Sequence, residues 1–210
     1  MQKHTNDKSR ILCCIVILIF FTVCSIVLSA YVIAGKTGAI DTALINFIQQ
    51  DKSPVLQILM SILTDIGNEY FVVVIIFIAG LWLWTSKSYG YLEEFMLVSL
   101  VSYIVNILVK SLVHRQRPFS WLGVTASGYS FPSGHSIMTF VIAAELVLIL
   151  RRLHLARWWV YSLAFIIVLA VGISRVYLGV HWPSDVAGGW LMGSTIIIAY
   201  SLLDLTQKIQ

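Results

Sequence analysis

The chain has little charge. Asp, Glu, Lys and Arg together make up 11% of its 210 residues, whereas about a quarter is usual in soluble domains. Hydrophobic residues account for 59%, against about 45–50% in soluble proteins. A soluble globule of this size could not bury so much apolar surface. The composition therefore excludes a soluble enzyme, a nucleic-acid-binding domain and a disordered chain, and it indicates a membrane protein.

Cysteines and alternating polar positions are also scarce. The three cysteines, Cys13, Cys14 and Cys24, all lie in the first apolar run, so they do not form a disulfide framework. The apolar runs are continuous rather than alternating, which excludes a transmembrane β-barrel. The net charge of +4 is typical of basic loops beside anionic lipid and does not require a nucleic acid as partner.

Six apolar runs have lengths that suit a bilayer core about 30 Å thick. We therefore predict an all-α polytopic membrane protein with six transmembrane helices, a single domain over residues 1–210 with its motif-bearing core at 91–203. Residues 41–50 are expected to form a short amphipathic surface helix with Leu44, Ile45, Phe47 and Ile48 facing lipid. The predicted spans are 11–34, 57–84, 91–113, 135–150, 158–174 and 184–203.

Six spans put both termini on one side of the membrane, and the distribution of basic residues indicates which side. The side of the termini holds eight Lys or Arg residues and the other side six, of which three belong to the candidate site described below. The sequence therefore predicts a plasma-membrane protein with both termini cytoplasmic and the loops 114–134 and 175–183 facing outward. The eight residues are Lys3, Lys8, Arg10, Lys87, Arg151, Arg152, Arg157 and Lys208.

The first polar cluster follows the third span and reads K-S-L-V-H-R-Q-R-P. Lys110 and Arg117 are seven residues apart, so a helix continued as far as Pro118 would bring them to nearly the same face. Two cations on one face at a membrane surface are costly unless they are paired. Taken alone, the pair is also consistent with side chains that reach out to lipid phosphates.

The second cluster, P-S-G-H, opens the fourth span. Pro132 suits the first position of a helix, and Ser133 and Gly134 leave the backbone accessible. The free N–H groups at a helix start attract anions, phosphate in particular. His135 would then lie beside a bound anion, although an incidental histidine at a loop-to-helix turn fits the same residues.

The third cluster reads S-R-V-Y-L-G-V-H-W-P-S-D. It holds Ser174, Arg175, His181 and Asp185, with Pro183 placed to open a helix. His181 and Asp185 are four residues apart, close enough for the carboxylate to hold one imidazole nitrogen and make the other more nucleophilic. A solvent-exposed Asp near a helix start would explain Asp185, but it would not explain His181 or Arg175.

Together the clusters supply three cations, two histidines, an orienting carboxylate and a helix N-terminus. A phosphoryl group in transfer spreads negative charge over its equatorial oxygens, and Lys110, Arg117 and Arg175 are suited to hold that charge. One histidine can attack phosphorus while the other protonates the leaving oxygen. The combination predicts phosphoryl transfer without a metal.

These residues resemble the type 2 phosphatidic acid phosphatase (PAP2) superfamily, which shares its site with vanadium haloperoxidases. The family pattern is K-x6-R-P, then P-S-G-H, then S-R-x5-H-x3-D. The sequence matches it in order at Lys110, Arg117, Pro118, Pro132, Ser133, Gly134, His135, Ser174, Arg175, His181 and Asp185.

The resemblance implies a role for each residue. His181 would be the nucleophile that forms a phosphohistidine, Asp185 would orient it, and His135 would protonate the leaving group and then activate water. No metal or other cofactor is expected. The residues expected to bind the substrate phosphate are Lys110, Arg117, Ser133, Gly134 and Arg175.

The resemblance also implies a substrate class, a lipid phosphate taken from the bilayer. Bacterial members with six spans act on phosphatidylglycerol phosphate, phosphatidic acid or undecaprenyl diphosphate. The phospholipid monoesters are favoured here, with undecaprenyl diphosphate in carrier-lipid recycling as the alternative. A vanadate-dependent oxidase and a non-catalytic lipid-phosphate binder or transporter are more remote, and the oligomeric state is left open.

Other polar residues receive structural interpretations. Asp65 and Glu69 on the second span are expected to have an interfacial packing role rather than to touch a headgroup. His114 and Arg115, inside the first motif, are expected to face water. Glu145 in the fourth span is expected to be a neutral buried acid.

Overall fold

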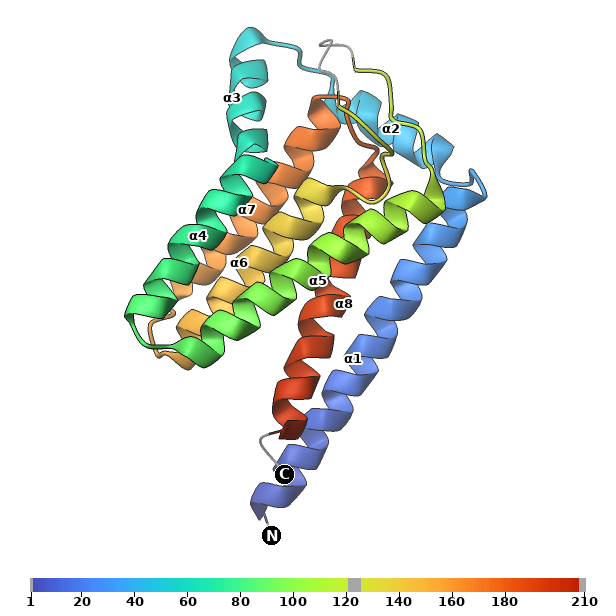
Figure 1. Ribbon diagram of the computed structural model, residues 1–210. Coiled ribbons are helices and arrows are strands. Elements are labelled where there is room, and N and C mark those ends of the chain that lie inside the picture. The colour runs from blue at the N-terminus through green and yellow to red at the C-terminus, as the bar shows by residue number, and fades with distance from the viewer. Residues whose placement is uncertain (1, 121–125, 208–210) are drawn as a thin grey trace.

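The protein is an all-helical bundle in a computed structural model that describes residues 2–120 and 126–207 (Figure 1). Five of the helices are long and apolar enough to cross a membrane, and the count is six if α3 and α4, which meet at a bend of 48°, form one broken span. The prediction of an all-α polytopic membrane protein is confirmed. The helices are α1 (Gln2–Ile33), α2 (Gly38–Ile48), α3 (Pro54–Asp65), α4 (Glu69–Thr85), α5 (Tyr89–Val113), α6 (Gly134–Arg152), α7 (Trp158–Tyr177) and α8 (Pro183–Gln207).

The bundle has two distinct ends. Both termini lie at one end, and α2 and the loops before α6 and α8 lie at the other, which we call the loop end (Figure 1). Helix α6 packs against α4, α5, α7 and α8, and α1 packs along α8. Helices α5 and α7 both end at the loop end, so the motif-bearing segments that follow them meet there.

The outside of the bundle is apolar and the centre is tightly packed. Phe20 on α1, Phe77 on α4 and Phe165 on α7 are each at least 60% exposed, whereas Ile137 and Val141 on the central helix α6 are fully buried. Large exposed apolar side chains around the whole bundle are stable only where lipid surrounds them. The surface therefore agrees with the composition.

The second span is broken, which corrects the single helix predicted over 57–84. Helix α3 ends at Asp65 and α4 begins at Glu69, where the Asn68 side chain accepts a hydrogen bond from Tyr70 N at 3.1 Å and caps the helix. Between them, a Cβ on Gly67 would lie 2.7 Å from Val171 and 3.0 Å from His135. Only glycine allows the backbone of the break to approach α6 and α7 so closely.

Helix α2 lies at the loop end with one face on the protein, and the expected lipid face is partly wrong. Leu44 and Phe47 are exposed as predicted, but Ile45 is buried and Ile48 packs against the end of α7. Asp41, one turn before Ile45, is 1% exposed. The inner face of this helix therefore presents a buried carboxylate to the loops that carry the motifs.

Candidate active site

A cavity of about 790 Å³ lies at the loop end between α3, α4, α5, α6 and α7. Its polar part holds five of the predicted site side chains, namely Lys110, Arg117, His135, Arg175 and His181. Its apolar part is formed by α4, α5 and α6 and includes Val72, Val73, Ile76, Met96, Leu100, Tyr103 and Met138. One continuous space therefore joins a cationic pocket to an apolar channel.

The channel reaches the lipid-facing surface between α4 and α5. Val73 on α4 is 63% exposed, and Leu100 and Tyr103 on α5 are 55% and 52% exposed. All three also line the cavity. Side chains that belong both to the cavity and to the outer surface indicate that the cavity opens sideways between α4 and α5.

Lys110 and Arg117 converge, although not on one helix as expected. Helix α5 ends at Val113, and His114 adopts a left-handed conformation with φ of 52° that turns the chain away. Arg117 therefore lies on the following loop. Lys110 Nζ still donates to the carbonyl of Tyr129 at 2.7 Å, and Arg117 Nη2 lies 3.3 Å from the same oxygen.

Arg117 is held by backbone carbonyls on two sides of the site. Its guanidinium donates to Ser127 O at 2.8 Å, Gly128 O at 3.0 Å and Val180 O at 2.7 Å. Burial lowers the pKa of Arg117, while the carboxylate of Asp185 acts in the opposite direction. The loops before α6 and α8 are thus joined through one cation that points into the cavity.

His181 is buried, with 2% of its surface exposed, and its two nitrogens have different partners. Nδ1 lies 3.3 Å from Asp185 Oδ2, and Nε2 lies 3.1 Å from Arg117 Nη1. Because a guanidinium can only donate, Nε2 must be the acceptor and Nδ1 must carry the proton. Burial, followed by the charges of Arg175, Arg117 and Lys110, lowers the pKa of His181 well below its usual value. The hydrogen-bond partners thus indicate a neutral imidazole whose Nε2 lone pair faces Arg117 in the cavity.

The P-S-G-H segment starts α6, but Pro132 lies before the helix rather than at its first position. Ser133 is the cap: its hydroxyl accepts from Ser136 N at 3.3 Å, and its own N–H donates to Asp185 O at 3.0 Å. The Ser133 side chain is fully buried and is not among the residues that line the cavity, whereas Gly134 and His135 are. A Cβ on Gly134 would lie 2.9 Å from the Asn106 side chain, so glycine lets this helix start pack on α5.

Arg175 lies in the last turn of α7, not in the loop predicted at 175–183. It is 7% exposed, and its Nη1 donates to Thr64 Oγ1 at 2.7 Å. Its Nε is buried and has no hydrogen-bond partner in the described part of the chain. A buried donor without a partner is costly, so this N–H is available for an anion in the cavity.

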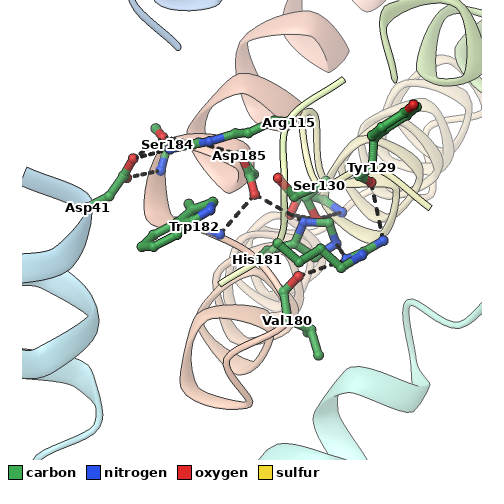
Figure 2. Close-up of polar contacts among 12 residues, drawn as sticks. Asp41, Arg115, Tyr129, Ser130, Val180, His181, Trp182, Ser184 and Asp185 are labelled. Carbon is green, nitrogen blue, oxygen red and sulfur yellow. Dashed lines mark hydrogen bonds and ion pairs between the residues drawn. The ribbon is translucent and has the colours of Figure 1, made fainter. Parts of the chain in front are cut away.

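Arg115 was expected to face water, but its side chain is largely buried. Its side chain is 13% exposed and makes two ion pairs of 2.6 Å, one with Asp185 Oδ1 and one with Asp41 Oδ2 (Figure 2). Asp185 Oδ2 also accepts from Trp182 N at 2.9 Å. Sequence reasoning missed Asp41 altogether, because it lies 74 residues from Arg115 on a helix interpreted as a surface element.

The break between α3 and α4 adds polar groups that sequence reasoning assigned to interfacial packing. Asp65 and Glu69 are exposed and line the cavity, together with Thr64 and Asn68. The Asp65 carboxylate is close enough to interact electrostatically with Arg175. The cavity is therefore cationic at its inner end and carries two acidic groups beside it.

Comparison with known proteins identifies the family of this chain. A family model described as the PAP2 superfamily matches residues 94–208. Phosphatidylglycerophosphatase B of Bacillus subtilis is 32% identical over 88% of this chain and 92% of its own, and an undecaprenyl-diphosphatase of Sulfolobus acidocaldarius is 29% identical over 86% of each chain.

A solved structure agrees with the fold. The crystal structure of a transmembrane PAP2 type phosphatidylglycerolphosphate phosphatase from Bacillus subtilis superposes with a TM-score of 0.80 at 31% identity, over 92% of this chain and 97% of that one. The sequence matches and the structural match identify the same family. The chain belongs to the PAP2 superfamily and is a membrane lipid phosphatase.

Proposed function

We propose that the protein hydrolyses the phosphomonoester of a glycerophospholipid, phosphatidylglycerol phosphate or phosphatidic acid. The continuous cavity carries this proposal. Its cations and histidines lie at the inner end, and its apolar channel opens sideways between α4 and α5. A lipid phosphate that enters from the bilayer would leave its chains in the channel while its phosphate reached the cations.

In the proposed reaction His181 Nε2 attacks phosphorus. A P–N bond forms, the P–O bond to the lipid alcohol breaks, and His135 donates the proton that the alcohol takes with it. Asp185 accepts a hydrogen bond from Nδ1–H and so stabilises the positive charge on the imidazole. Water, deprotonated by His135, then attacks the phosphohistidine, the P–N bond breaks, and inorganic phosphate leaves.

The proposed phosphate site uses Lys110, Arg117, Arg175 and the backbone at Gly134. These groups would hold the equatorial oxygens as charge develops on them. Ser133 would contribute through the helix start that it caps. Since the positive charge comes from side chains of this chain, we propose a reaction that needs no metal.

The choice of a monoester over a diphosphate rests on Asp65 and Glu69. A lipid diphosphate would bring its second phosphate directly beside the first and close to these carboxylates, where like charges repel. Phosphatidylglycerol phosphate instead places a glycerol with a free hydroxyl next to the terminal phosphate, and carboxylates accept hydrogen bonds from hydroxyls. The acidic pair therefore favours the glycerol headgroup.

The membrane orientation is part of the proposal. We infer that both termini face the cytoplasm and that the loop end faces outward at the plasma membrane. Both termini lie at the same end of the bundle, together with Lys87 in the turn between α4 and α5, Arg151 at the end of α6 and Arg157 just before α7. Basic residues concentrate on the cytoplasmic side of membrane proteins.

Phosphate release by the detergent-purified protein, with EDTA present, tests the proposal. The three substrates are phosphatidylglycerol phosphate, phosphatidic acid and undecaprenyl diphosphate. We expect release from the phospholipids at a higher kcat/KM than from the diphosphate, and no effect of EDTA. A preference for undecaprenyl diphosphate would move the function to carrier-lipid recycling, and inhibition by EDTA that divalent metal reverses would contradict the metal-free reaction.

Neutralising the acidic pair should change this preference. In the double variant Asp65→Asn, Glu69→Gln, we expect the ratio of kcat/KM for undecaprenyl diphosphate to that for phosphatidylglycerol phosphate to rise about tenfold, since a like-charge repulsion of roughly 1.4 kcal/mol is removed. Glu93→Gln, a change of an exposed acid at the start of α5, is the control. An unchanged ratio would show that the pair does not select the headgroup.

A further inference from the structure

We propose that Asp41 and Arg115 are positioning residues for the reaction: through Arg115, Asp41 fixes the orientation and the charge balance of the Asp185 carboxylate that serves His181. The inference rests on the proposed roles of His181 and Asp185. It gives a function to α2, a helix outside the three sequence motifs, and to a residue in the spacer of the first motif.

The two oxygens of Asp185 have separate partners. Oδ1 lies 2.6 Å from Arg115 Nη1, whereas Oδ2 lies 3.3 Å from His181 Nδ1 and accepts from Trp182 N at 2.9 Å (Figure 2). The guanidinium is planar and rigid, so a bond to Oδ1 restricts rotation of the carboxylate. Arg115 therefore holds the second oxygen toward the imidazole without competing for it.

Arg115 is itself fixed from α2. Its Nη2 donates to Asp41 Oδ2 at 2.6 Å and to Thr37 Oγ1 at 3.0 Å, and its guanidinium carbon lies 5.3 Å from the centre of the Trp182 ring. With its side chain 13% exposed, the arginine lies between two carboxylates and an aromatic face. It has little freedom to turn away from Asp185.

Asp41 binds Ser184 at the start of α8, and Ser184 directly precedes Asp185 in the sequence. Its Oδ1 accepts from Ser184 N at 2.9 Å, and its Oδ2 accepts from Ser184 Oγ at 2.7 Å. Ser184 Oγ also lies 2.7 Å from Arg115 Nη1. Asp41 thus binds both the arginine and the helix turn that carries Asp185, and all these contacts are largely closed to water.

The charge of Asp41 affects how strongly Asp185 can stabilise a positive charge on His181. Asp41 balances Arg115, so that Asp185 keeps one net negative charge toward His181. Without Asp41, the positive charge of Arg115 would offset Asp185 just where the imidazole becomes positive on bonding to phosphorus. Since these groups are buried, water would screen little of that change. Buried ion pairs contribute little net stability on average, which favours a role in the reaction over a purely structural one.

The test is Asp41→Asn, which keeps the size of the side chain but removes its charge and replaces one acceptor oxygen with an NH2 donor. We expect kcat for lipid-phosphate hydrolysis to fall by about 10–100-fold, by analogy with the loss of a partner that orients a metal-binding histidine. KM and competitive inhibition by inorganic phosphate should stay within about twofold, because the cations that bind phosphate are untouched. Asp41→Glu, which keeps the charge, should recover most of the lost kcat.

The chain offers a matched control at the opposite end of the bundle. Arg152 also lies between two carboxylates, Glu94 at 2.6 Å and Asp204 at 3.2 Å. Glu94→Gln removes one of them without approaching the site, so it should shift the melting temperature as Asp41→Asn does but leave kcat unchanged. Equal kcat values for Asp41→Asn and the wild type, or equal losses in Asp41→Asn and Glu94→Gln, would overturn the inference.

Two further variants distinguish a failure of the positioning role from a folding defect and from a failure of the proposed reaction. If Asp41→Asn does not accumulate as folded protein, Arg115→Lys replaces it, since a lysine keeps the charge but cannot bridge both carboxylates. The same loss of kcat at constant KM is expected, and wild-type kcat would overturn the inference. His181→Ala, assayed in parallel, tests the proposed reaction separately: activity retained in that variant would contradict the reaction itself, whatever Asp41→Asn does.

Discussion

Replacing His181 with Ala should abolish turnover, with a loss in kcat of at least about 10⁴-fold, as expected when a nucleophile that acts together with its base is removed. The structure gives the reason. Nε2 is directed to Arg117 at the inner end of the cavity, and Nδ1–H is held by Asp185. No other neutral nucleophile with an orienting acid lies among the described residues that line the cavity.

The measurement is phosphate release from phosphatidylglycerol phosphate by purified His181→Ala, with its melting temperature compared with the wild type. His154→Ala is the control, since His154 is exposed in the turn between α6 and α7 at the other end of the bundle. That variant should have wild-type activity. Steady-state turnover by folded His181→Ala above one hundredth of the wild-type rate would rule out His181 as the nucleophile.

Replacing Arg175 with Lys should lower kcat by about 10²–10³-fold, comparable to the loss of one preorganised donor to a transition state. Arg175 Nη1 is occupied by Thr64, and Nε is buried with no partner in the described part of the chain. Lysine keeps the positive charge but has no planar fork to reach both Thr64 and a phosphate oxygen. The effect should therefore appear although the charge is conserved.

Steady-state kinetics of Arg175→Lys on the same substrate measure this effect, with Arg157→Lys as control. Arg157 is exposed at the start of α7, so its replacement should not change kcat. A kcat for Arg175→Lys within about threefold of the wild type would mean that charge alone is sufficient at this position and that the unpaired Nε has no role in the transition state.

Much of the fold could be predicted from the sequence because a helix that crosses a bilayer must be long, apolar and nearly free of charge. Low charge and long apolar runs predicted a helical membrane protein, and Pro183 predicted the start of α8, as the structure has it. The break at residues 66–68 was not accessible. Gly67 is required there because Val171 and His135 come from two other helices, and no local pattern reveals that contact.

In the site, too, the sequence predicted the residues within the motifs but not the contacts between distant helices. The spacing of the motifs predicted which side chains would share one end of the bundle, and the structure places Lys110, Arg117 and His181 around one cavity. Arg115 was misjudged because its partner Asp41 comes from a distant helix. Hydropathy identified α2 as amphipathic, but only tertiary packing determines that its inner face carries a buried carboxylate.

In the proposed reaction, the phosphoryl group passes through a covalent bond to His181. Rapid quenching of the wild-type protein after mixing with phosphatidylglycerol phosphate labelled in its terminal phosphate tests this most directly. We predict a phosphoenzyme that is stable in alkali and labile in acid, as phosphohistidine is, located at residue 181 and absent from His181→Ala. Multiple turnovers in which no labelled protein forms at any time, or label on another residue, would contradict a phosphohistidine at residue 181.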